Sequence, residues 1–316
     1  MKWILGVMAL ALVLGAAVER AADQLRPPIR IIVPFAPGTS GDLLSHLVAE
    51  ELEASLRQPV LLEHQVGAGG RVGVGSLARA AADGSVIGLG NESTHVTLPL
   101  LNARTAYDPV RDFRPLTLAA RTTMAVAVNP SLLPVNTLAE LLAVAKTRPI
   151  TFGSPGEGSP QQLIGMLLAQ RSGGRFEHVA QPGAAATARE LAEGRLPMAV
   201  TTLSALLAYP GKVHILAIGD AARRPALPEV PTLSETWPGF VVTGWLAYFA
   251  PAGIPEPAHT RLTAALRAAL SKPRVVAALR AQAMDPVGGS PDELGDLVRT
   301  GLEAWKPQIR RASSER

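Results

Sequence analysis

The chain has 316 residues, enough for two domains of ordinary size, and 47% of them are apolar, which allows a sizeable buried core. Its 30 basic and 26 acidic residues are interspersed, and only 4% of the residues are aromatic, so a nucleic-acid partner is not expected. The absence of cysteine excludes disulfides, thiolate metal sites, cysteine nucleophiles and a lipid-modified N-terminal cysteine.

The first residues have the pattern of an export signal. Lys2 supplies a positive start, and an almost unbroken apolar run covers residues 4–17 and ends in small residues that suit cleavage. A run of about 14 apolar residues is short for a transmembrane helix. We therefore expect residues 1–22 to be a signal peptide that is removed on export to the periplasm. An uncleaved membrane anchor is the alternative.

An apolar, β-branched run at residues 31–33 leads into a turn rich in proline, glycine, threonine and serine, and an amphipathic segment at residues 43–56 follows. This order predicts a strand, a tight loop and a helix. Thr39 and Asp42 match the capping pattern of helix starts. Because a helix start has free backbone N–H groups and a partial positive charge, the loop is predicted to form half of a site for a small carboxylate. The alternative is a capped turn that binds nothing.

Next come a predicted strand at residues 59–62, a helix at 71–82 and a strand at 86–89. Polar residues at 91–95 follow this last strand, and we interpret them as a loop. In open α/β sheets, ligands bind at such strand ends. The apolar stretch at residues 116–128 is predicted to cross into a second lobe.

The opening pattern then recurs. A strand at residues 150–152 and a glycine-rich loop precede Ser159, Pro160 and Gln162, which fit the N-cap, first and third positions of a helix. A second helix start is therefore available for an anion, although these residues could do no more than cap the helix. The repeated alternation of strands and helices indicates parallel sheets. Further strands are predicted at 176–180, 198–202, 215–218 and 241–251, and helices at 136–146, 185–193, 259–270, 273–283 and 291–309.

Motifs for catalysis are weak. The histidines show no metal-ligand spacing, and Asp42 occupies the place of the last glycine in the nucleophile elbow G-x-S-x-G. His46 lies one helical turn after Asp42, so the two are expected to pair. Residues 73–78 match G-x-G-x-x-A, but a glycine cluster at 67–70 separates them from the preceding strand. A binding protein is therefore favoured, without a metal or cofactor; the alternative is a secreted α/β enzyme, either a hydrolase or a dinucleotide oxidoreductase.

Short motifs also recur in a fixed order from residue 28 to the C-terminal helices: 32–38 with Asp42, 67–70, 82–84, 107–109, 112–113, 153–158, 227–232 and 250–253 with Trp245. In this order and spacing, the chain resembles the periplasmic solute-binding proteins of tripartite tricarboxylate transporters, the Bug or TctC type. The resemblance implies an α/β, two-lobed periplasmic-binding-protein (Venus flytrap) fold, in which each lobe is a mainly parallel sheet flanked by helices. Lobe 1 would comprise residues 26–125 and 245–316, and lobe 2 residues 126–244.

The resemblance implies no catalysis. It implies a monomer that captures a small carboxylate and delivers it to membrane transporter subunits; a ligand-sensing partner of a membrane receptor is the alternative. The implied site has two jaws and flanking residues: Phe35, Gly38, Thr39, Ser40 and Asp42; Ser154, Ser159 and Gln162; and Ser93, Thr94, Gln181 and Thr202.

The chain departs from the family pattern at several of these positions. Thr39 stands where the family usually has glycine, Gln162 where it often has histidine, and Thr202 where the residue is often acidic. Gln181 and Pro182 replace a tyrosine–lysine pair. The loss of a cation and a hydrogen-bond donor points to a less acidic or differently shaped ligand.

Overall fold

The computed structural model describes residues 27–101 and 105–314, with the backbone alone for 307–314; the expected signal peptide lies outside the described residues. The elements of the first part of the chain are β1 (Ile29–Val33), α2 (Ser40–Leu56), β2 (Val60–His64), η1 (Ala68–Gly70), α3 (Arg71–Ala78), β3 (Val86–Asn91), η2 (Ser93–Thr97) and α4 (Leu98–Leu101). The middle part contains β4 (Phe113–Val128), α5 (Leu138–Thr147), β5 (Ile150–Ser154), α6 (Pro160–Ser172), β6 (Phe176–Ala180), α7 (Ala184–Ala192), β7 (Met198–Thr202), α8 (Leu203–Leu206), β8 (His214–Ile218) and α9 (Leu233–Thr236). The last part contains β9 (Thr243–Pro251), α10 (Glu256–Leu270), α11 (Pro273–Ala281), β10 (Met284–Pro286) and α12 (Pro291–Ser314).

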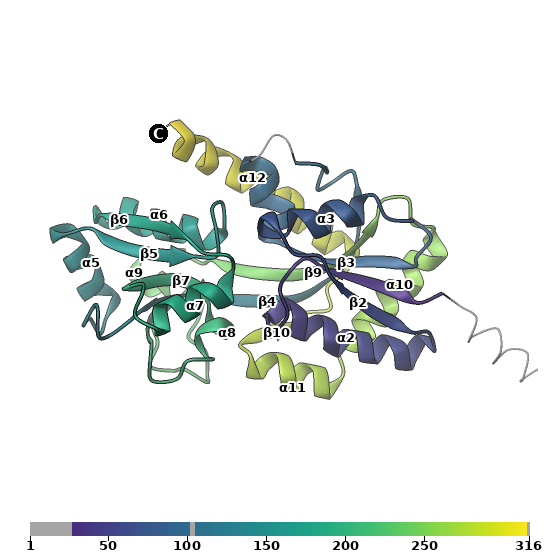
Figure 1. Cartoon of the computed structure of the whole chain (residues 1–316), viewed down its shortest axis with the longest axis horizontal. Coiled ribbons are helices and arrows are strands. Elements are labelled where there is room, and N and C mark those ends of the chain that lie inside the picture. Colours follow the sequence, from purple (N-terminus) through teal and green to yellow (C-terminus); the bar gives the residue numbers. More distant parts are fainter. Residues whose placement is uncertain (1–26, 102–104, 315–316) are drawn as a thin grey trace, which may run out of the picture.

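The described strands form one mixed sheet in the order β2-β1-β3-β9-β4-β7-β5-β6, and β8 and β10 each pair with β4. The pairs at both ends of the sheet are parallel, as the alternating pattern predicts. The strands in the middle are antiparallel, because β9 returns from the second group of elements beside β4. Figure 1 shows β4 and β9 running between the two groups of strands and helices.

Strand β4 belongs to both groups. Its first part, residues 113–123, pairs with β9, whereas its last part, residues 124–128, pairs with β7 and β8. Nearly all of its residues are buried, since helices cover both of its faces, and this explains the long apolar run in the sequence.

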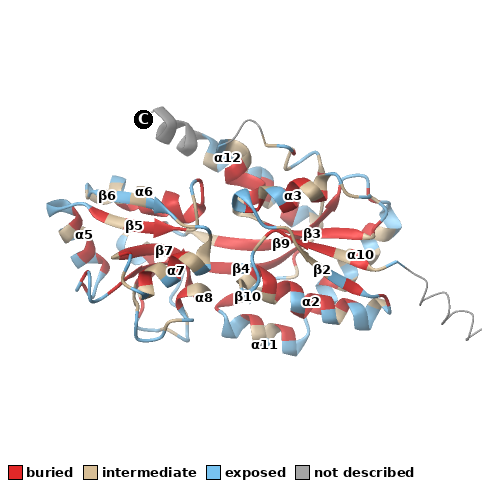
Figure 2. Ribbon diagram, in the orientation of Figure 1, coloured by how far each residue is buried: buried red, intermediate tan, exposed pale blue. Residues whose placement is uncertain are grey.

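Alternating side chains of the strands fill two cores in each group. In the first group, Ile31 and Tyr248 face the core covered by α2, α10 and α11, whereas Ile32 and Phe249 face the core covered by α3 and α12. In the second group, Val126 faces the core under α5 and α6, and the neighbouring residues of β4 face α7 and α8. Figure 2 shows this buried interior along the sheet.

Two local predictions need correction. Residues 91–95, predicted as a loop, are the end of β3 and the start of η2, a π-helical segment that continues into α4. The helix predicted at 71–82 ends at Ala78. Among the described residues, no helix is both long enough and apolar enough to cross a membrane.

Candidate functional site

The loop between β1 and α2 is held by its own polar groups. Thr39 caps α2: its hydroxyl donates to the carbonyl of Ala36 (2.8 Å) and accepts from the backbone N–H of Asp42 (3.4 Å). The carboxylate of Asp42 in turn accepts from the backbone N–H of Gly38 (2.7 Å). Gly38 has φ +80°, in the left-handed region that favours glycine. The capping pattern predicted from the sequence is therefore present.

Asp42 is buried, with 8% of its surface exposed. Its Oδ1 lies 2.7 Å from Nε2 of His64 and 3.3 Å from Nε2 of His46. Burial by itself would raise the pKa of Asp42, but the hydrogen bonds from Gly38 and His64 and the two nearby imidazoles hold the pKa below its ordinary value. The carboxylate is therefore ionised at neutral pH. The predicted pairing with His46 is confirmed.

His64 was not predicted as part of the site. It lies 22 residues beyond Asp42 and is brought there by the parallel pairing of β1 with β2, in which His64 stands opposite Val33. Only the register of the two strands could have indicated this contact.

The loop between β5 and α6 is held in a similar way. Ser159 caps α6 by accepting from the backbone N–H of Gln162 (3.1 Å), and Pro160 occupies the first turn. Oε1 of Gln162 accepts from the backbone N–H of Gly158 (2.6 Å). Ser154, at the end of β5, is fully buried, and its hydroxyl lies 3.1 Å from that of Ser159. The second capping pattern is also present.

His178, on β6, joins these side chains and was missed by the sequence analysis. Its Nε2 lies 2.7 Å from Oγ of Ser154, and its Nδ1 lies 3.0 Å from Nε2 of Gln162. Because the N–H of Gly158 can only donate, the oxygen of the Gln162 amide must face it, and the amide nitrogen then donates to Nδ1. The proton of a neutral His178 consequently sits on Nε2 and is donated to Ser154.

Each helix start retains free donors. The backbone N–H groups of Ser40 and Gly41 at α2, and of Gln161 at α6, have no acceptor among the residues that the structure describes. The first N–H groups of a helix lack intrahelical partners and attract anions. The side chains of both loops therefore fix the backbone, and the backbone presents the donors.

The flanking residues lie at the ends of other strands. Ser93 opens η2, and Thr94 beside it is fully buried, with its hydroxyl 3.0 Å from the carbonyl of Asn91 and from Nδ1 of His95. Thr94 therefore shapes this turn, and its hydroxyl is occupied locally.

Gln181 follows β6 and donates its backbone N–H to the carbonyl of Ser154 (2.9 Å), whereas Thr202 ends β7 and its hydroxyl accepts from that of Ser204 (3.2 Å). Phe35 lies against the start of α2: a Cβ at Gly41 would approach Phe35 Cδ2 to 2.7 Å.

Helix α4 contacts the loop between β5 and α6 and also the glycine cluster of η1. Gly158 has φ +73°, and a Cβ on it would lie 2.0 Å from Cδ1 of Leu101 and 3.9 Å from Cδ2 of Leu98. A Cβ on Gly69 would lie 3.2 Å from the other methyl group of Leu98. Leu98 thus contacts both the loop after β5 and the glycine cluster that follows β2. The loop after β5 therefore packs against α4, an element of the first group.

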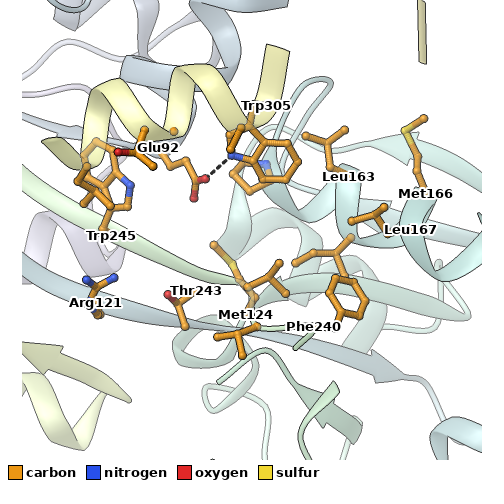
Figure 3. Close-up of a pocket in the computed structure, with 18 of the residues that line it drawn as sticks. Glu92, Arg121, Met124, Leu163, Met166, Leu167, Phe240, Thr243, Trp245 and Trp305 are labelled. Carbon is orange, nitrogen blue, oxygen red and sulfur yellow. Dashed lines mark hydrogen bonds between the residues drawn. The ribbon is translucent and has the colours of Figure 1, made fainter. Parts of the chain in front are cut away.

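The structure also contains a cavity of about 700 Å³ between α6, α12 and the crossing strands β4 and β9. Figure 3 shows Leu163, Met166 and Leu167 of α6 on one side, and Trp305 of α12 on the other. None of the twelve predicted site residues lines this cavity, although its lining includes Glu92 and Pro160, the neighbours of Ser93 and Ser159.

Glu92 is the acidic residue of this cavity. Its Oε1 accepts a hydrogen bond from the indole Nε1 of Trp305 (2.6 Å), drawn as a dashed line in Figure 3. Burial raises the pKa of Glu92 to about 7, and the bond from Trp305 opposes this rise. No motif in the sequence indicated this residue, because Trp305 lies 213 positions further along the chain.

The chain matches the model of a family described as "Tripartite tricarboxylate transporter family receptor" over residues 44–313. The protein BugT of Bordetella pertussis is 30% identical over 308 residues, which cover 95% of this chain and 94% of BugT. Three solved structures are similar over 90–92% of this chain and 98–99% of their own. They are Rpa4515 of R. palustris with adipate (TM-score 0.85, 29% identity), the periplasmic binding protein BugD (0.83, 26%) and MatC of Rhodopseudomonas palustris with bound malate (0.81, 27%).

These comparisons confirm the predicted α/β periplasmic-binding-protein fold. The matched family is one of receptors, and its structural neighbours are solute-binding proteins rather than enzymes, so the enzyme alternatives are excluded.

Proposed function

Because the chain belongs to the tripartite tricarboxylate transporter receptor family, we propose that it captures a small organic carboxylate between two lobes and delivers it to the membrane subunits of such a transporter. Two similar structures hold dicarboxylates, adipate in one and malate in the other. This chain would use the same class of ligand in the periplasm, as a monomer, after residues 1–22 have directed its export.

The observation that carries the proposal is the pair of helix starts with free donors. The N–H groups of Ser40 and Gly41 would bind the ligand from one lobe, and the N–H of Gln161 would bind it from the other. A carboxylate that accepts such bonds makes charge-assisted hydrogen bonds, which are stronger than bonds between neutral groups. Ligand contacts with both lobes would then favour a closed arrangement.

The charges of the proposed site favour a ligand with few negative charges. The twelve proposed site residues include no lysine or arginine, and Asp42 places a buried, ionised carboxylate at one helix start. A third carboxylate on the ligand would have no cation to meet among these residues. We therefore propose mono- and dicarboxylates in preference to tricarboxylates.

The lobe boundaries would lie where β4 and β9 cross, with residues 126–244 as lobe 2 and residues 26–125 and 245–316 as lobe 1. Separate cores support this division, since β4 contributes to the two cores of the first group before residue 124 and to the two cores of the second group from Met124 onward. X-ray scattering with and without a bound carboxylate should show compaction, and an unchanged radius of gyration at saturation would contradict closure.

The direct test of the ligand class is calorimetry with acetate, malate, adipate and citrate on the wild type and on Thr39→Ala. Thr39 holds the loop that presents two of the donors, so its removal should weaken dicarboxylate binding by about tenfold, the equivalent of one hydrogen bond. Ser159→Ala should have a similar effect from the other lobe.

Thr137→Ala is the matched control. Thr137 caps α5 by accepting from the N–H of Glu140 (3.1 Å), and α5 lies away from both loops (Figure 1). Each of these substitutions should cost about 1 kcal/mol of stability through the lost cap. The proposal fails if no carboxylate binds the wild type, or if Thr39→Ala and Ser159→Ala bind it as tightly as Thr137→Ala does.

A further inference from the structure

The cavity beside the crossing strands has the composition of a ligand site. Its volume of about 700 Å³ lies in the range of small-molecule pockets, and its wall is mainly apolar, with a few polar groups. Leu163 and Leu167 come from the second group of elements, and Trp305 comes from the first. In Figure 3 the carboxylate of Glu92 lies between the indoles of Trp245 and Trp305.

Glu92 has an unused acceptor in this cavity. Its Oε1 is bonded to the indole of Trp305, while its Oε2 has no partner among the described residues. Glu92 is half-buried, and it is one of the residues that line the cavity. A carboxylate removed from bulk water without a cation is unfavourable, and a ligand that supplies a donor relieves this penalty.

We propose that this cavity is a second ligand site, which binds an organic cation with an apolar body, such as an alkylammonium ion. The ammonium group donates a charge-assisted hydrogen bond to the open oxygen of Glu92. The alkyl chain lies against the side chains of α6 and Phe240. The site shares no residue with the proposed carboxylate site and does not depend on it.

Two arginines also line the cavity, but they do not favour an anion there. Arg121 is exposed, so its guanidinium keeps its water, and Arg171 lies 4.5 Å from the ring centroid of Phe240. An anion that penetrated as far as the indoles would meet the carboxylate of Glu92. The carboxylate of Glu92, beside the indoles, therefore selects a cation.

The titration of Glu92 agrees with this geometry. Because burial raises the pKa of Glu92 to about 7, a bound ammonium ion stabilises the ionised form and expels a proton. Binding of the cation should therefore strengthen as the pH rises through about 7.

The test compares three probes with the same alkyl chain, hexylammonium, hexanol and hexanoate, by calorimetry at about pH 8. We expect hexylammonium to bind the wild type most tightly. Glu92→Gln keeps the size of the side chain and an acceptor for Trp305 but removes the charge, so it should weaken hexylammonium binding by about tenfold or more and leave hexanol unchanged. Glu229→Gln, at an exposed carboxylate outside the cavity, should bind as the wild type does.

A second variant tests the location independently. Leu167→Trp fills the cavity from α6 and should abolish hexylammonium binding, while adipate and malate bind as they do to the wild type. The proposal is overturned if Glu92→Gln or Leu167→Trp binds hexylammonium as tightly as the wild type does, or if hexanol or hexanoate binds the wild type as tightly as hexylammonium does. Failure of the carboxylates to bind anywhere would not alter this result, because it concerns the other site.

Discussion

The strand-end loops and the cavity differ in how completely their polar side chains are hydrogen-bonded. In the loops, Asp42 and Gln162 each have at least two partners, and these partners fix the backbone at a helix start. In the cavity, Glu92 has one partner among the described residues, the indole of Trp305, and its second oxygen has none there. The loops thus satisfy their side chains and present backbone donors, whereas the cavity presents an unsatisfied side chain.

The difference has a consequence for stability. A buried polar group with complete hydrogen bonding contributes to folding, but a desolvated carboxylate without a cation opposes folding when it is ionised. The same carboxylate in Asp42 and in Glu92 therefore has its pKa moved in opposite directions, downward in the loop and upward in the cavity. Substitutions at the two regions should separate these effects.

The largest expected change in the free energy of unfolding comes from substituting Glu92. Between about pH 4.5, the ordinary value, and about pH 7, the folded state binds more protons at this carboxyl than the unfolded state does, so the free energy of unfolding falls as the pH rises. Below this window the carboxyl is protonated in both states and the difference vanishes. Glu92→Gln should therefore be more stable than the wild type at about pH 8, by up to about 3 kcal/mol, and equally stable at about pH 4.

Denaturant unfolding at both pH values measures this difference. Glu229→Gln serves as the control, because Glu229 is exposed and its substitution should change stability little at either pH. If the difference between Glu92→Gln and the wild type is the same at both pH values, Glu92 is not a desolvated carboxyl in the folded protein.

The sequence could indicate the loops because their bonds are local. Thr39 contacts the backbone of Asp42, and Ser159 that of Gln162, each three residues away, so the capping pattern contains both partners. The alternation of strands and helices likewise indicated the parallel ends of the sheet. The recurrence of the strand, loop and capped helix, together with the resemblance to a known family, led to the prediction of two lobes.

The remaining contacts depend on the tertiary fold. His64 and His178 reach their partners through the registers of β2 and β6, and Trp305 reaches Glu92 from the last helix. No regular spacing of residues in the sequence predicts these contacts. The π-helical turn at Ser93 was missed because its polar residues have loop-like propensity, while the buried bonds of Thr94 stabilise the helical form.

The second-largest expected change in stability comes from the hydrogen-bond network of Ser154, Gln162 and His178 in the loop between β5 and α6. Gln162→Ala removes the acceptor of the Gly158 N–H and the donor to His178, which leaves two polar groups without these partners. We expect a loss of about 1–3 kcal/mol in the free energy of unfolding, the usual penalty for unsatisfied buried groups. Denaturant unfolding monitored by circular dichroism measures it.

Gln161→Ala is the matched control for this variant. Gln161 is the preceding residue of α6, is equally buried, and has no side-chain hydrogen bond among the described residues. Gln161→Ala should lower the free energy of unfolding clearly less than Gln162→Ala does. Equal losses in the two variants would mean that the network of Ser154, Gln162 and His178 adds nothing beyond side-chain packing.

The smallest expected effect is at Trp305, and two causes oppose each other there. Trp305→Phe removes the indole donor, which stabilises the ionised form of Glu92, so this loss raises the pKa of Glu92 above about 7. A smaller ring also admits water, which lowers the pKa by reducing desolvation. Phenylalanine retains most of the apolar bulk, so the lost bond should dominate and the pKa should rise, with a stability change of about 1 kcal/mol or less at neutral pH. Carbon-detected NMR of the glutamate carboxyl follows the titration directly.

Trp237→Phe is the control, because the indole of Trp237 lies outside the cavity lining and has no hydrogen bond among the described residues. The pKa of Glu92 should therefore be the same in this variant as in the wild type. A lowered or unchanged pKa in Trp305→Phe would mean that water, rather than the indole, sets the charge of Glu92.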